Sequence, residues 1–405
     1  MTPEARAAPP AARRETVSRP LFIIFLTTFV NLVGFGIIIP LLPFYAQTFG
    51  ASPIVIGLLF ASFSLSQLIA SPLLGDLSDR WGRRPVLIFS LLGTVLSFVM
   101  LAMANSLAML FAARIVDGLS GGNITTARAY IADISTEENR AKAFGVLGAA
   151  FGLGFIVGPG LGAAFSRISY TAPIWAAAAI TVVAVAMAWF WLPETVHRSQ
   201  AGGGSPWRAL REMRGRADLR TLLTIDFIYW TAFAVYQTTF ALFGARRFGF
   251  GASDIGYLLS AFGFLGVVVQ GGLVGPVVRR LGERRTLGLG LLCAAAGWGG
   301  SAATHSLPVF VAMLVPAALG IGLCNATLSA LVSKSAGAHE QGRVQGAAGA
   351  LESLGRTLGP VWGNGSLQRF GEASAYGSAA VALLGAAALT LRYRPKARPA
   401  DPPVL

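Results

Sequence analysis

Charged residues are scarce in this chain. Asp, Glu, Lys and Arg make up only 12% of its 405 residues, whereas soluble domains carry about a quarter. Hydrophobic residues make up 54%, and no charged residue occurs between Leu21 and Gly75 or between Thr286 and Ser333. Each uncharged run is long enough for two membrane spans of roughly 20 residues. The composition therefore argues against a soluble fold and predicts a membrane protein.

Cysteine and the usual catalytic motifs are also scarce. Cys293 and Cys324 are the only cysteines, and both fall in expected spans, so they offer no disulfide framework. There is no Gly-Lys-Ser phosphate loop and no cluster suited to a metal or a nucleophile, so we expect no ATP hydrolysis, no cofactor, no metal and no enzymatic activity. No histidine falls at the centre of an expected span, which leaves carboxylates as the credible proton carriers.

Apolar runs predict an all-α membrane protein with twelve transmembrane helices in two pseudo-symmetric six-helix bundles. We expect spans near residues 21–43, 54–74, 86–105, 107–132, 142–165, 172–192, 221–244, 255–277, 286–304, 307–333, 344–367 and 373–391. The expected organisation is a tail at 1–20, a first bundle at 21–193, a linker at 194–220, a second bundle at 221–392 and a tail at 393–405.

The net charge of +14 arises from basic residues that gather in alternate loops. The two tails, the linker and the loops after the second and eighth spans are rich in arginine. The opposite loops hold only Arg167, Arg246, Arg247 and Arg369. By the positive-inside rule, both termini are expected to be cytoplasmic, in a multi-pass protein of the cell (inner) membrane. This placement makes the lipid bilayer the expected partner of the basic residues, and we expect no nucleic acid.

One glycine and proline signature occurs twice, at matching places in the two halves. The first copy comprises Gly154, Gly158, Pro159 and Gly162, and the second comprises Gly355, Gly359, Pro360 and Gly363. Glycine at this spacing lets another helix approach closely, and proline bends the segment. Tight packing alone would explain one copy. Two copies are what a transporter built from structural repeats predicts.

The loop at residues 75–84, which reads Gly-Asp-Leu-Ser-Asp-Arg-Trp-Gly-Arg-Arg, resembles the signature loop of the major facilitator superfamily. A degenerate copy follows Gly275, with Arg279 in place of the acidic residue. The run Arg114-Ile-Val-Asp117-Gly118, the glycine and proline signature and the segment at 341–346 add to this resemblance. Together these motifs resemble the drug:proton antiporter branch, and most closely the bacterial tetracycline-type efflux pumps.

The resemblance implies a latch at the cytoplasmic face that closes when the central site opens outward. In it, Asp79 would approach the positive N-terminal end of the span at 344–367, and Asp133 would pair with Arg83. Membrane anchoring by basic residues is the alternative, but it does not explain the glycines and Asp79. The expected latch residues are Gly75, Asp79, Arg80, Gly82, Arg83, Arg84, Asp133 and Arg140.

The sequence also departs from the tetracycline-type pumps. The first span has Asn31 where such relatives usually have an acidic residue, and the spans at 86–105 and 286–304 contain no Asp or Glu. Tetracycline as substrate and the proton carrier therefore cannot simply be transferred from the family to this chain.

Charges at membrane depth are costly, so each one present is a candidate site for proton coupling. Arg114 and Asp117 share one helix face, and either form a static strut or separate when a proton arrives. Glu352 and Arg356 form a similar pair, and Glu352, near the midplane, is the first choice as carrier. Asp226 lies closer to the expected cytoplasmic end, where its side chain could reach the headgroups instead.

Amides and aromatic residues within the spans are candidates for a substrate cavity, with helix packing or lipid contact as the alternative for each. The candidates are Asn31, Phe35, Gln67, Tyr229, Trp230, Phe233, Tyr236, Gln237 and Asn325. The sequence as a whole predicts a monomeric secondary transporter that exports a small, fairly apolar compound in exchange for protons by alternating access. A nutrient uniporter or symporter and a membrane sensor or scaffold without transport remain open.

Overall fold

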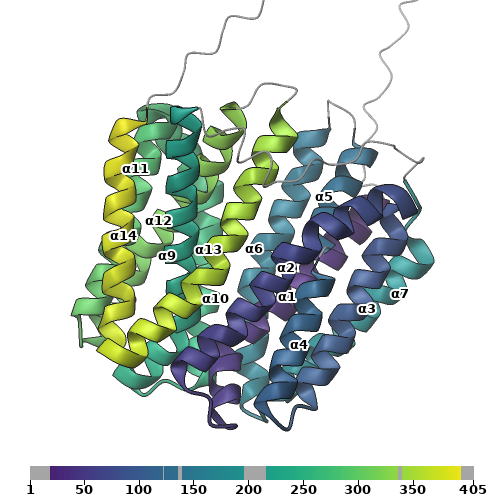
Figure 1. Ribbon diagram of the computed structural model, residues 1–405, viewed down its shortest axis with the longest axis horizontal. Helices are drawn as coiled ribbons and strands as arrows, with labels where there is room; N and C mark the ends of the chain where they lie inside the picture. The colour runs from purple at the N-terminus through teal and green to yellow at the C-terminus, as the bar shows by residue number, and fades with distance from the viewer. Residues whose placement is uncertain (1–18, 122, 136–138, 196–215, 336–339, 394–405) are drawn as a thin grey trace, which may run out of the picture.

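The structure is a computed structural model that describes residues 19–121, 123–135, 139–195, 216–335 and 340–393. The expected tails and most of the linker lie outside these residues. The described chain forms long helices that run side by side (Figure 1). In the first half these are α1 (Arg19–Gln47), α2 (Pro53–Trp81), α3 (Arg83–Ala102), α4 (Leu107–Ser120), α5 (Asn123–Ile134), α6 (Arg140–Ser166) and α7 (Ala172–Trp191). In the second half they are α9 (Ala217–Phe248), α10 (Ala252–Val268), η2 (Val269–Leu273), α11 (Val274–Ala303), α12 (Leu307–Lys334), α13 (Gln341–Phe370) and α14 (Glu372–Arg392).

Among the described residues, eight helices are long and apolar enough to cross a membrane by length and composition alone. One of these, Ala252–Ala303, is long enough to hold two spans. The remaining expected spans correspond to α4 with α5, to α9 and to α13. These helices carry the intramembrane charges Arg114, Asp117, Asp226, Glu352 and Arg356. The helices that miss this criterion are thus the ones that carry the candidate proton-coupling residues.

Three of the expected spans differ in form from the prediction. The span expected at 107–132 divides into α4 and α5 beside Gly121. The spans expected at 255–277 and 286–304 have no loop between them, because α10 passes through the π-helix η2 into α11, which turns at Gly282. Gly282 has a φ of 75°, a left-handed conformation that glycine adopts without the steric cost of a side chain.

The two copies of the glycine signature make equivalent contacts within the two bundles. In the first bundle, a Cβ atom added to Gly158 of α6 would stand 2.7 Å from the carbonyl oxygen of Val33 in α1. In the second bundle, a Cβ atom added to Gly359 of α13 would stand 2.5 Å from the carbonyl oxygen of Thr231 in α9. The signature therefore lets the backbones of α1 and α6, and of α9 and α13, pack in direct contact.

The bundles contact each other through α2 with α13 and through α6 with α10. We call the end where α1 begins and α14 ends the basic end, because arginines at the start of α3 and on both sides of Gly282 in α11 lie there. At the opposite end, the backbone N–H of Ile54 donates a hydrogen bond of 3.0 Å to Oε1 of Gln368. Ser260 Oγ likewise donates to the carbonyl oxygen of Ile156. These contacts join the bundles at the opposite end, through Ile54 and Gln368, and nearer the middle of the helices, through Ser260 and Ile156.

Toward the basic end, the same helices separate. A Cβ atom added to Gly145 or Gly148 of α6 would meet nothing within 4 Å, and the same holds for Gly346 and Gly349 of α13. In Figure 1, α2 and α13 lie close together near the lower edge and spread apart toward the upper edge, where the chain ends emerge. At these glycines the two bundles do not pack against each other.

The glycine signature predicts a matched pair of stability effects in α6. Gly158→Ala places a methyl group against the Val33 carbonyl, so we expect a loss of about 1–3 kcal/mol, as overpacking usually gives. Gly148→Ala adds the same group where nothing lies within 4 Å, so it should leave stability unchanged or slightly raised. Thermal unfolding of the two purified variants in detergent measures the difference, and equal midpoints would contradict the packing role.

Candidate functional site

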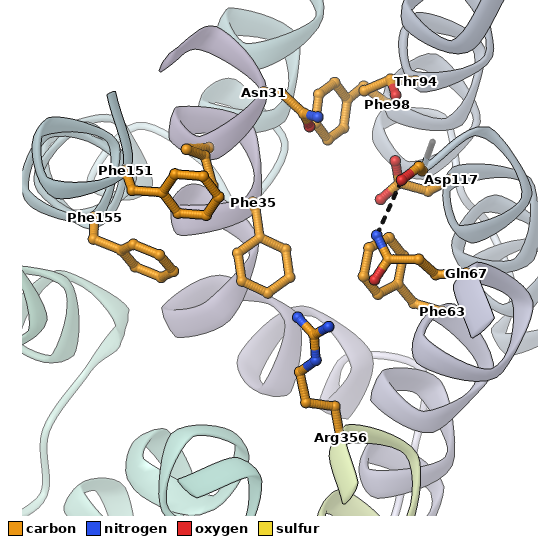
Figure 2. A pocket seen from close by; sticks show the side chains of 12 residues that line it. Asn31, Phe35, Phe63, Gln67, Thr94, Phe98, Asp117, Phe151, Phe155 and Arg356 are labelled. Atoms are coloured by element: carbon orange, nitrogen blue, oxygen red, sulfur yellow. Dashed lines mark hydrogen bonds between the residues drawn. The ribbon is translucent and has the colours of Figure 1, made fainter. Parts of the chain in front are cut away.

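A cavity of about 590 Å³, counting its open mouth, lies near the middle of the helices. Its wall comes almost entirely from the first bundle, and Arg356 of α13 is the only contribution from the second bundle (Figure 2). The lining residues are Asn31, Leu32, Phe35, Phe63, Gln67, Thr94, Phe98, Asp117, Gly121, Phe151, Phe155 and Arg356. Of the expected substrate-cavity residues, Asn31, Phe35 and Gln67 are among them.

Five of the twelve lining residues of the cavity are phenylalanines. The ring of Phe35 lies 5.9 Å from that of Phe63 and 6.2 Å, edge to face, from that of Phe155. The polar lining residues are Asn31, Gln67, Thr94, Asp117 and Arg356. Gln67 already donates a hydrogen bond of 3.2 Å to the carbonyl oxygen of Gly121. An apolar wall with a few fixed polar groups is the usual composition of a site for a small organic molecule.

The expected ion pair of α4 is formed. Nη1 of Arg114 lies 2.8 Å from Oδ2 of Asp117, and the guanidinium also lies over the ring of Phe63, 4.2 Å from its centroid. Arg114 is only 1% exposed. Two of its nitrogens, Nε and Nη2, have no hydrogen-bond partner among the described residues. Asp117 lines the cavity, and its negative charge is balanced by the positive charge of Arg114.

Asp226 does not reach the headgroup region, which corrects one expectation. Its residue is 2% exposed, and its Oδ2 atom has no hydrogen-bond partner among the described residues. The side chain faces the interior of the second bundle, where it interacts with Glu352 of α13 and with the side chain of Trp230. Two carboxyl groups from different helices thus act on each other electrostatically, and both interact with one indole ring.

The expected ion pair between Glu352 and Arg356 is not formed. No carboxylate among the described residues lies at ion-pair distance from Arg356, although Glu352 is one turn away on the same helix. The guanidinium lies instead over the ring of Trp230, 5.4 Å from its centroid, and extends into the cavity toward Phe35 and Phe63 (Figure 2). Arg356 is therefore the cation that faces the cavity directly.

Several other expected cavity residues pack within the second bundle instead. Tyr229 is fully buried and donates a hydrogen bond of 3.0 Å to Oδ1 of Asn325. Tyr236 is 2% exposed and stacks on Trp298 at 5.1 Å, inside an aromatic core. These side chains have partners within their own bundle and do not line this cavity, so their role in a substrate cavity stays a prediction. The expected residues that do not line the cavity are Tyr229, Trp230, Phe233, Tyr236, Gln237 and Asn325.

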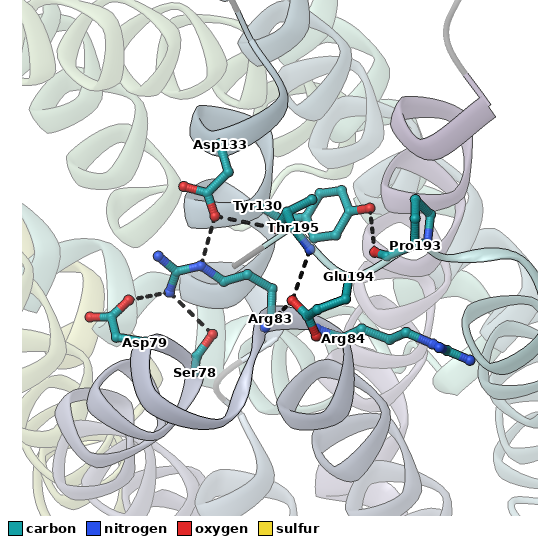
Figure 3. Close-up of polar contacts among 9 residues, drawn as sticks. All are labelled: Ser78, Asp79, Arg83, Arg84, Tyr130, Asp133, Pro193, Glu194 and Thr195. Carbon is teal, nitrogen blue, oxygen red and sulfur yellow. Dashed lines mark hydrogen bonds and ion pairs between the residues drawn. The ribbon is translucent and has the colours of Figure 1, made fainter. Parts of the chain in front are cut away.

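At the basic end, Arg83 is the centre of a network that joins α2, α3 and α5 (Figure 3). Its Nε atom lies 2.9 Å from Oδ2 of Asp133, and its Nη1 atom pairs with Asp79 and donates to Oγ of Ser78 at 3.2 Å. The pair of Arg83 with Asp133 is the one that the resemblance implied. Asp79 is paired within its own bundle here.

Glu194, just after α7, also belongs to this network, but it was not among the latch residues expected from the sequence. It accepts hydrogen bonds from the backbone N–H groups of Arg83 and Arg84, at 2.9 and 3.1 Å, and so caps the start of α3. The backbone turns at Gly82 with a φ of 111°, and a side chain there would collide with the Glu194 carboxylate. An acidic residue directly after Pro193, at the end of a span and on the same side as an arginine-rich loop, was the available signal.

The remaining latch residues make fewer contacts. A Cβ atom added to Gly75 would meet nothing within 4 Å, and Arg80 lies exposed at the end of α2. Arg84 donates to the backbone carbonyl of Trp189. The side chain of Arg140 lies outside the described residues.

The sequence matches the family described as the Major Facilitator Superfamily over residues 24–360 and again over 271–404. It is 35% identical to the class C tetracycline resistance protein of Escherichia coli, over 84% of this chain and 88% of that protein. It is 31% identical to multidrug resistance protein 2 of Bacillus subtilis, over 85% of this chain and 88% of that protein.

Solved structures share the fold. The human organic anion transporter MFSD10 aligns with a TM-score of 0.72 and 24% identity, over 92% of this chain and 99% of that chain. A bacterial homologue of the lysosomal transporter Spinster, solved inward-facing and unoccupied, aligns with a TM-score of 0.75 and 16% identity, over 94% of this chain and 96% of that chain. At these identities the likeness concerns the fold alone.

The cap formed by Glu194 predicts a specific loss of stability. Glu194→Ala leaves the backbone N–H groups of Arg83 and Arg84 without their acceptor, so we expect a loss of about 1 kcal/mol. Thr195→Ala removes a neighbouring hydroxyl whose contact with Asp133 is long, at 3.4 Å, and should change little. Thermal unfolding compares the two, and a larger effect of the threonine change would refute the capping role.

Proposed function

Because the chain belongs to the Major Facilitator Superfamily, we propose that it exports a small, fairly apolar compound in exchange for protons, by alternating access between its two bundles. It is a multi-pass membrane protein, and its relatives include tetracycline and multidrug resistance proteins. The observation that carries the proposal is the cavity with its five phenylalanines, into which Arg356 extends from the helix that also carries Glu352. Drug-efflux relatives and a cavity of this composition support the same function.

The substrate that the cavity wall favours is a small molecule with aromatic or other apolar surface, because aromatic rings and a few amides line the cavity. Stacking against the rings of Phe35, Phe63 and Phe155 would hold the compound, and the amides of Asn31 and Gln67 would orient it. Tetracycline is the first probe to use, since several relatives are named for resistance to it.

We propose that the cavity opens toward the basic end and that this end is cytoplasmic. Arginine-rich loops remain on the cytoplasmic side of membrane proteins. With that orientation, the structure is an inward-facing state that can receive a compound from the cytoplasm. In the outward-facing state the bundles would close at the basic end, where Asp79 would leave Arg83 for the N-terminal end of α13.

Asp226 and Glu352 are the proposed proton carriers. A charged carboxylate inside the membrane costs several kcal/mol unless it is paired, so protonation removes a large penalty there. Asp117 is compensated by Arg114 at 2.8 Å, and we assign this pair to holding α4 rather than to carrying the proton. The proton carriers thus lie in the second bundle, whereas most of the cavity wall lies in the first.

Proton flux tests the function and the carriers together. Proteoliposomes with an imposed pH gradient should transport tetracycline, and its addition should release protons from the wild-type protein. Asp226→Asn and Glu352→Gln should each reduce this flux about tenfold or more, because the amides cannot carry a proton. Asp218→Asn, on the same helix but in its first turn, is the control and should transport normally. Unchanged flux in both amide variants would exclude these carriers, and absence of gradient-driven transport of any tested drug would contradict the function.

Thiol labelling tests the orientation. A cysteine at Ser306, between α11 and α12 at the end opposite the basic end, should react with a membrane-impermeant maleimide added to intact cells. A cysteine at Ser205, in the linker and outside the described residues, should react only after the membrane is opened. The reverse pattern would show that the basic end faces outward.

A further inference from the structure

Arg356 connects the two halves of the site. Its backbone belongs to α13 in the second bundle, but its side chain enters a cavity that is otherwise lined by the first bundle (Figure 2). On its own side it touches Trp230, which also interacts with both Asp226 and Glu352. The Arg356 side chain therefore contacts both the cavity, where a compound would bind, and Trp230, which interacts with the two proposed proton carriers.

The Arg356 guanidinium has two positions available, one beside Glu352 and one in the cavity. Glu352 lies one turn away on α13 and exerts the strongest attraction, and Asp226 on α9 adds to it. Arg128 on α5 acts on both Glu352 and Arg356, and Tyr229 on α9, with Cys324 behind it on α12, faces the same carboxyl groups. Residues four apart on a helix are neighbours, so a change of rotamer alone would bring Arg356 onto Glu352. In the structure it lies in the cavity instead, at no ion-pair distance from any described carboxylate.

We propose that Arg356 makes the binding of protons and the binding of substrate mutually exclusive by moving between Glu352 and the cavity. When Glu352 is charged, it draws the guanidinium out of the cavity, and a compound can enter between the phenylalanine rings. When a proton binds to a carboxylate oxygen of Glu352, the attraction is lost. The guanidinium then returns to the cavity, where the faces of aromatic rings attract a cation.

The direction of this effect is the one that export against protons requires. A compound in the cavity pushes Arg356 onto Glu352, which favours the charged carboxylate, and the proton leaves to cytoplasmic water. A proton on Glu352 returns Arg356 to the cavity and displaces the compound. Each ligand thereby lowers the affinity for the other by the same factor, which is the reciprocity of two coupled sites. The structure corresponds to the protonated, empty, inward-facing state of this cycle.

The inference rests on the proposed function, but it can be tested without any substrate. Asn31→Cys places a thiol in the cavity wall, and a cationic methanethiosulfonate reports whether the cavity is free. The full-length protein in nanodiscs is labelled at about pH 5.5 and about pH 8.5, in the Asn31→Cys protein and in the same protein with Arg356→Gln. Because both carry the same thiol, the ratio of their rates cancels the ionisation of the thiol itself. The parent chain with Cys293 and Cys324 gives the background.

At the lower pH, Asn31→Cys should react roughly tenfold more slowly than its Arg356→Gln counterpart, and at the higher pH the two rates should converge. Glu352→Gln should keep labelling slow at both values, because nothing then draws Arg356 out of the cavity. Arg356→Lys keeps a cation and should retain part of the pH dependence, which separates the charge from a general loss of packing. A rate ratio that does not change with pH, or fast labelling in the Glu352→Gln protein, would overturn the proposal.

These outcomes are separate from those of the transport assay. Failure of the wild-type protein to move any drug along a pH gradient would contradict the proposed function, even if the labelling followed pH as expected. Normal gradient-driven transport with labelling that ignores Arg356 would retain the function and remove Arg356 from it.

Discussion

The cost of charge inside a membrane governs most of this structure. A buried ion needs a partner, a polar cavity or a proton. Arg114 and Asp117 meet this need by pairing at 2.8 Å on one helix, over the ring of Phe63. Asp226, Glu352 and Arg356 do not form a closed set of ion pairs, since Arg356 extends into the cavity and one oxygen of Asp226 has no partner among the described residues. Because these charges are not fully paired, we expect protonation of Asp226 or Glu352 to change the free energy of the protein more than protonation of Asp117.

The glycine signature explains how such charged helices are held while the bundles remain able to move. On one face of α13, Gly359 packs against the backbone of α9 in the same bundle. Nearby, the carbonyl of Pro360 faces Gly57 of α2 in the other bundle, where an added Cβ atom would stand only 2.5 Å away. One segment of α13 therefore joins its own bundle tightly and also serves as a contact between bundles. Arg356 lies one turn before this segment, so movement of the bundles would also move it relative to the cavity.

In the network at the basic end, the ion pairs and the helix cap form within a single bundle. Arg83 binds Asp79, Asp133 and Ser78, and Glu194 caps the next helix, all within the first bundle. The loop signature therefore fixes α2, α3 and α5 relative to one another, and Asp79 is paired with Arg83 in this conformation.

The pattern of uncharged runs and arginine-rich loops determined the membrane fold, the number of spans and their pairing into two halves, because hydrocarbon thickness and lipid charge act on composition alone. The repeated glycines likewise determined which helices pack tightly, since close contact depends on the absence of a side chain. Only the tertiary structure decided which polar groups face one another. Spacing along α13 brought Glu352 and Arg356 to one face, yet the guanidinium turned toward Trp230 and the rings of the other bundle. Asp226, Tyr229 and Tyr236 turned inward for the same reason: the direction of a side chain in a bundle depends on neighbours from distant parts of the chain, which no local pattern records.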